Sequence, residues 1–158
     1  MKRLKFENTL LDGDLRALIG ARIGESDILE LLNGELTFLP SDHDLGGYSQ
    51  LDAISLEVFG ALPYEQTRTD LELQNHSTFS VEIEIYTQGK KKKQNNRIIQ
   101  DIIIDLLQEP KKLKNFYNSG LLLVETSEGD ALIDNTYRSV LRFGGLCDNQ
   151  VKYIYPKI

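Results

Sequence analysis

The feature that most constrains the fold is a strand pattern followed by a helix pattern. Phe79, Val81, Ile83 and Ile85 alternate with polar residues, which predicts a strand with one apolar face. Residues 95–108 then place apolar side chains at three- and four-residue steps, which predicts an amphipathic helix ended by Pro110. A strand with one wet face is typical of an antiparallel sheet that is covered on one side only.

Weaker patterns complete the order of elements. Residues 9–33 carry apolar residues at helical spacing, weakened by two glycines, and residues 40–50 have the composition of a mobile loop. Alternation predicts further strands over 52–59, 67–74, 121–124, 137–143 and 151–155, with a turn or bulge at 75–78 and a loop at 125–130. We therefore predict an α+β fold in one domain spanning 1–158. Its sheet is largely antiparallel, with helices packed on one face, and a sheet–helix–sheet core covers 52–155.

Composition and charge narrow the functional classes. The chain has 158 residues and a formal net charge of −6, which argues against a dedicated nucleic-acid binder. The charge is polarised: residues 86–115 hold eight Lys or Arg and three Asp or Glu, a local charge of +5, which leaves −11 elsewhere. The longest apolar runs are far shorter than the roughly 18 residues of a membrane span, so no membrane partner is predicted.

The rare residue types offer little chemistry. Cys147 is the only cysteine, so an internal disulfide is impossible, and we expect it to be a small buried residue. His43 and His76 have no further ligand at metal-binding spacing. No phosphate-binding loop or catalytic triad can be assembled, and we predict neither a cofactor nor a resident metal.

Two sets of charged residues remain as candidates. Glu82 and Glu84 share one strand face and, with Asp70 and a lysine, could hold Mg²⁺ for phosphodiester hydrolysis. Lysines follow only after Gly89, however, in what reads as a loop, and alternating glutamates are common on the wet face of a sheet. The run Lys90, Lys91, Lys92 and Lys93 reads as a solvated loop, or as a contact with an acidic partner or with DNA phosphates.

The order of elements and a few side chains resemble a known protein family. A strand from Phe79 to Tyr86 is followed by a Gly-Lys turn, the helix 95–108 and a strand from Leu121. The stretch from Asn135 to Phe143 comes next and contains Tyr-Arg-Ser-Val-Leu-Arg-Phe. With Leu62-Pro63-Tyr64 upstream, residues 60–145 resemble the tail-terminator, or tail-completion, proteins of long-tailed bacteriophages and prophages. Residues 1–50 do not align, which leaves open another neck or minor-capsid role.

The resemblance implies a structural, non-enzymatic protein of the virion tail that is assembled in the host cytoplasm. Its partners would be further copies in a ring, typically a hexamer, together with the tail tube protein and the head–tail connector protein. DNA would at most pass through the ring. Candidate contact residues are the four lysines and the polar outer face of the sheet, which carries Glu82, Glu84, Arg138 and Arg142. The open alternatives are a small Mg²⁺-dependent nuclease and a monomeric adaptor that binds through the lysines.

Overall fold

The computed structural model describes residues 7–30, 36–39, 52–63, 75–131 and 135–149. Three helices and six strands follow one another in the order α1 (Glu7–Ile23), α2 (Ser26–Leu29), β1 (Leu36–Phe38), β2 (Asp52–Pro63), β3 (Asn75–Gln88), α3 (Lys92–Gln108), β4 (Lys111–Lys112), β5 (Phe116–Asp130) and β6 (Thr136–Asn149). The predicted α+β class is confirmed.

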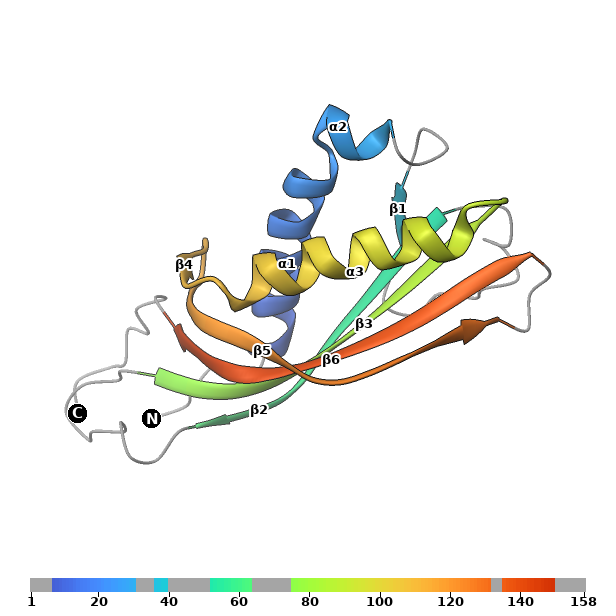
Figure 1. The fold of residues 1–158 in the computed structure, drawn as a ribbon. Coiled ribbons are helices and arrows are strands. Elements are labelled where there is room, and N and C mark those ends of the chain that lie inside the picture. Colours follow the sequence, from blue (N-terminus) through green and yellow to red (C-terminus); the bar gives the residue numbers. More distant parts are fainter. Residues whose placement is uncertain (1–6, 31–35, 40–51, 64–74, 132–134, 150–158) are drawn as a thin grey trace, which may run out of the picture.

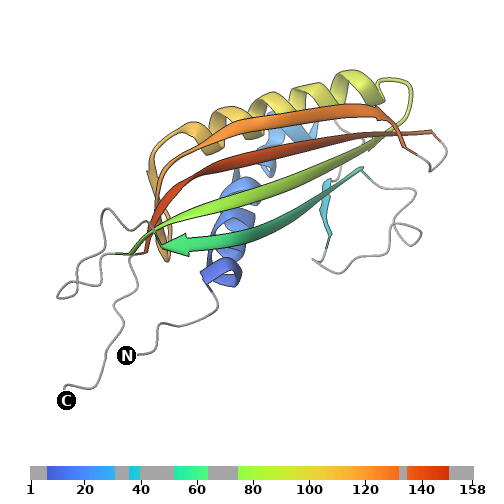
Figure 2. The same ribbon diagram turned by 90° about the horizontal axis from the view of Figure 1, so that it is seen from below.

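All six strands form one curved sheet in the order β1-β2-β3-β6-β5-β4 (Figure 1). Only β1 and β2 run parallel, and every other neighbouring pair is antiparallel. Helices α1 and α3 lie on the same face, α1 against β2 and α3 across β3, β6 and β5, while none of the described helices lies on the opposite face (Figures 1 and 2). The predicted one-sided packing is therefore present, and we call the helix-free side the outer face.

The core lies between the two helices and the inner face of the sheet. It contains Leu11, Leu15 and Ile19 of α1, the predicted apolar stripe of α3 and the inward residues of β2, β3 and β6. Phe79 and Phe116 meet edge to face inside it, with ring centroids 5.4 Å apart. Burial of these side chains is the main stabilising contribution.

Buried polar side chains fix the helices on the sheet. Asn96 of α3 is fully buried; its amide NH₂ donates to the carbonyls of Ile85 (3.0 Å) and Tyr137 (3.2 Å), and its oxygen accepts from Ser139 Oγ (2.6 Å). Asp14 of α1 accepts from the backbone N–H groups of Asn115 and Phe116. Because such groups are costly to bury unpaired, these bonds specify how each helix sits on the sheet.

Several expected boundaries are wrong. Residues 75–78, predicted as a turn or bulge, belong to β3 and pair in regular register with β6, while the register shift against β2 lies between Phe59 and Leu62. Residues 125–130, predicted as a loop, continue β5, and β2 and β6 also run past their expected ends. Helix α3 begins at Lys92 rather than residue 95.

Some predictions fall outside the described residues. These are the loop at 40–50, the strands at 67–74 and 151–155, and the end of the helical region 9–33; the described part of that region forms α1 and α2. Among the described helices, none combines the length and apolar character needed to cross a membrane.

Candidate interaction surface

The outer face carries a row of charges that crosses four neighbouring strands. Register places Glu57 of β2 opposite Glu82 of β3, Glu82 opposite Arg142 of β6, and Arg142 opposite Glu125 of β5. We call these four residues the acidic row, because they comprise three carboxylates and one guanidinium. The strand alternation that sends Val81 and Ile83 into the core sends Glu82 outward.

Charges in the acidic row are only partly compensated. Arg142 lies 3.3 Å from Glu82 through Nε and 3.2 Å from Glu125 through Nη1. Glu57 is exposed and has no ion pair or hydrogen bond within the described residues, although it directly faces Glu82. Like charges directly opposite each other in a sheet are destabilising, so among the described residues this row has an uncompensated negative charge.

A second charged group on the same face is fully satisfied. Arg138 Nη2 donates to Glu84 Oε1 at 2.7 Å, and the hydroxyl of Tyr86 also donates to the Glu84 carboxylate. Burial, together with the bond to Glu84, raises the pKa of Tyr86 to about 12. Tyr86 packs with buried Leu39 and Ala53, so this group closes one end of the outer face.

Exposed apolar side chains lie beside the acidic row. Next to the acidic row, the four strands bring a second set of outer-face residues into register: Phe59, Ser80, Gly144 and Leu122. Phe59 is 41% exposed, Leu122 61% and Val124 74%, and Val124 lies over Gly144, where no side chain fills the surface. A row of large apolar groups beside an unbalanced row of charges is typical of a surface that becomes covered on assembly.

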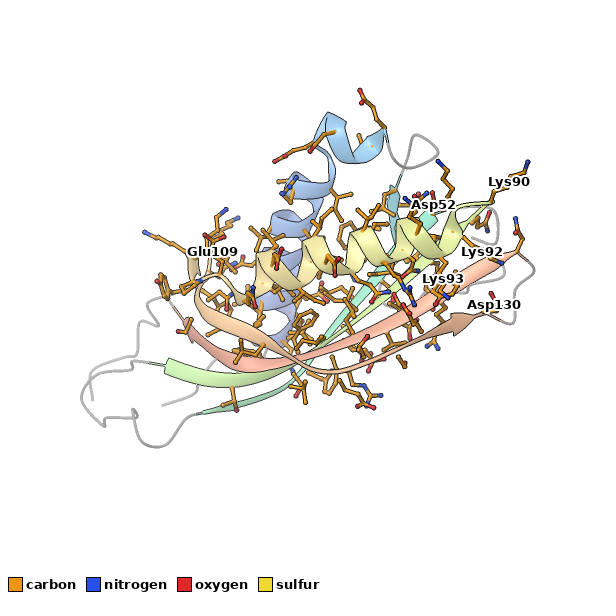
Figure 3. The ribbon with its side chains drawn as sticks, viewed as in Figure 1. Asp52, Lys90, Lys92, Lys93, Glu109 and Asp130 are labelled. Carbon is orange, nitrogen blue, oxygen red and sulfur yellow. The ribbon has the colours of Figure 1, made fainter. Side chains whose placement is uncertain are left out.

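The lysine run forms a turn at the end of the molecule where β3 leads into α3 (Figure 3). We call residues 89–93 the lysine turn. Gly89 has a φ of 93°, a conformation that other residues rarely adopt, and it reverses the chain here. Lys90, Lys91 and Lys93 are exposed and lack ion pairs within the described residues, whereas Lys92 lies 3.6 Å from Asp130.

The lysine turn also includes the start of a helix, which corrects its prediction as a loop. Lys92 and Lys93 are in the first turn of α3, Lys91 is the N-cap without a side-chain cap, and the first turn contains no acidic residue. Positive side chains and the positive end of the helix dipole therefore add at one point. Lys90, Lys91, Lys93 and Arg97 surround a hollow of about 620 Å³ at the surface.

Sequence reasoning missed one electrostatic group altogether. Arg97 of α3 donates to Glu128 of β5 through Nη2 at 2.5 Å, and Gln100 donates to the same carboxylate at 2.9 Å. These bonds lower the pKa of Glu128 to about 2. No sequence pattern marks this group, because residues 125–130 hold no apolar side chain and have the composition of a loop, and only their pairing with β6 makes them a strand.

The candidate contact residues therefore fall into two separate places. Glu82, Glu84, Arg138 and Arg142 gather on the outer face, as predicted, whereas the lysine turn follows the end of β3 and leads into α3. For the nuclease alternative, Glu82 and Glu84 do share a face, but each is engaged by an arginine. Asp70 lies outside the described residues, and among those described no three His, Cys, Asp or Glu side chains are grouped to hold a metal ion.

The fold has a counterpart in a known particle. The chain matches no family model and no curated protein. Among solved structures it is similar to a chain from the "Virion of native gene transfer agent (GTA) particle". The match has a TM-score of 0.57 and 15% sequence identity, and it covers 86% of this chain and 96% of the other. At this identity the likeness establishes a shared fold.

Proposed function

We propose that this protein is a structural component of a virion and acts as a tail terminator. Copies would form a ring at the head-proximal end of the tail tube, stop its polymerisation and offer a docking face to the head connector. The protein would work in the virion tail after assembly in the host cytoplasm. The observation that carries this proposal is the fold match, which spans 96% of a virion chain.

Two further features support an assembly role. Residues 60–145 resemble the tail-terminator family in element order and in side chains from Asn135 to Phe143. In addition, the surface chemistry suits contact between subunits: the outer face has exposed apolar groups and unbalanced carboxylates, while the lysine turn has the opposite charge. A ring needs two different patches on each copy, and these two patches differ in both place and charge.

Tail length is the readout that tests the proposal. Deleting the gene in the strain that produces the particles should give tail tubes longer than normal and heads without tails, because polymerisation no longer stops. Supplying the wild-type gene in trans should restore tails of uniform length. Electron microscopy of the lysate measures both effects directly.

The same experiment separates the alternatives. Tubes of normal length beside tail-less heads would point to another neck or minor-capsid role. Unchanged particles and unchanged infectivity would contradict any structural role. Because the measurement is made in the assembling particle, it does not require the isolated chain to form rings.

A further inference from the structure

Within the described residues, no cation pairs with Glu57 of the acidic row. Arg142 pairs with Glu82 and Glu125, and Glu57 faces Glu82 with no cation between them among the described residues. The side chain of Glu82 is only 24% exposed, so water screens that charge less than it would at a free surface. A positive group placed over Glu57 and Glu82 would remove the repulsion.

The lysine turn has the complementary surplus. Lys90, Lys91 and Lys93 point into solvent, and the uncapped N-terminus of α3 adds partial positive charge behind them. Asp130, the carboxylate that forms an ion pair with this turn, contacts Lys92. Within the described residues, three cations thus remain without an ion pair.

The two surfaces cannot meet within one molecule. Six residues of β3 separate Glu82 from Gln88, which corresponds to about 20 Å of strand. The lysine turn also lies where β3 joins α3, on the side of the sheet that carries the helices, whereas the acidic row is on the outer face (Figures 1 and 3). A contact between them must therefore join two copies.

We propose that the lysine turn of one copy binds the acidic row on the outer face of the next. Lys90, Lys91 and Lys93 approach Glu57, Glu82 and Glu125, and the adjoining Leu122 and Val124 lose their exposure to water. Because each copy uses two different patches, the contact is heterologous and propagates from copy to copy. This inference rests on the proposed self-assembly and identifies the two surfaces that carry it.

Reciprocal charge reversal tests the contact. K90E/K91E/K93E and E57K/E125K should each weaken self-association at least tenfold in sedimentation velocity, in the presence of the tail tube protein if the tube nucleates the ring. Mixing the two variants should restore association, since the reversed turn of one meets the reversed row of the other, and the alternate contact joins an unchanged turn to an unchanged row. K111E/K112E/K114E makes the same charge change at exposed lysines of the β4 edge and should have no effect.

Disulfide trapping gives an independent readout. The sole native cysteine, Cys147, is fully buried, so background cross-linking is low. In assembled particles, K91C/E57C should give a ladder of covalent oligomers on mild oxidation, whereas K91C alone and E57C alone should give none. A covalent dimer from either single variant would mean that like surfaces meet, and this would overturn the heterologous contact.

Other results would overturn the inference while leaving the proposed function intact. These are undiminished association of both charge-reversal variants, failure of the mixture to recover, or no ladder from the double-cysteine variant in particles that contain the chain. If the proposed function is wrong, the gene-deletion experiment will show it, because particles without the gene will have normal tails. The two proposals therefore fail separately.

Discussion

Replacing Glu57 with lysine should stabilise the isolated chain while weakening its assembly. Glu57 is exposed on β2 and faces Glu82 directly across the strand pair. Glu82 already interacts with Arg142, and Glu57 has no such partner within the described residues. The substitution therefore turns a repulsive cross-strand pair into an attractive one.

The magnitude follows from the register. Two unit charges about 5.5 Å apart in water interact by about 0.8 kcal/mol, so reversing one charge changes the energy by roughly 1.5 kcal/mol. At physiological ionic strength the Debye length of about 8 Å reduces this by about half. We therefore expect Glu57→Lys to raise the free energy of unfolding by about 0.8 kcal/mol, and Glu57→Gln by about half as much.

Urea unfolding followed by circular dichroism, at concentrations where the chain is monomeric, measures this change. Glu125→Lys is the matched control, because it makes the same charge change in the same row but removes a partner of Arg142, and so should give no gain. In 1 M salt the gain from Glu57→Lys should largely vanish. An equal gain from Glu125→Lys, or a loss of stability with Glu57→Lys, would refute the reasoning.

Three further predictions concern groups that hold or report on the fold. Asn96→Leu should lower the free energy of unfolding by about 3 kcal/mol in urea titrations, because two backbone carbonyls and a buried hydroxyl each lose a hydrogen bond worth about 1 kcal/mol. The folded-state pKa of Glu128 is about 2 against an ordinary 4.5, so its contribution is complete above pH 4.5 and is lost as the pH falls towards 2; in Glu128→Gln that part of the pH–stability profile should be flat. Burial raises the pKa of Tyr86 to about 12, so an absorbance titration of the folded protein should lose a late phenol in Tyr86→Phe, and an unchanged curve would contradict the assigned burial.

The sequence predicted those elements whose pattern directly reports burial. Residues 79–86 and the helix up to Gln108 alternate or repeat clearly because one side of each faces the core. The α+β class and the helix-free outer face follow from these two elements. Likewise, the two-residue spacing was enough to place Glu82 and Glu84 on one face.

The errors occur where neighbouring elements override local preference. Residues 75–78 have turn composition, yet they extend β3 because β2 and β6 pair with them on both sides. Gly145 sits inside β6 because a Cβ there would lie 2.6 Å from the carbonyl oxygen of Gly120 on β5. Glycine at this position permits a close approach of two backbones, whereas the sequence pattern indicated that the strand ends there.

Strand register explains why the acidic row could not be predicted. The sequence shows Glu57, Glu125 and Arg142 as unrelated charges, because nothing local tells which residues of distant strands stand opposite each other. The same limitation hid the pair between Arg97 and Glu128, which are 31 residues apart. The lysine turn was visible as a run, but its separation from the acidic row is a property of the folded sheet.

Locating the protein in the assembled particle tests its role most directly. We expect a gold-labelled tag on the chain to mark one site per particle, at the head-proximal end of the tail, and mass analysis of that complex to give a fixed number of copies. Label spread along the tail or over the head, or no label on purified particles, would contradict a ring that ends the tail tube.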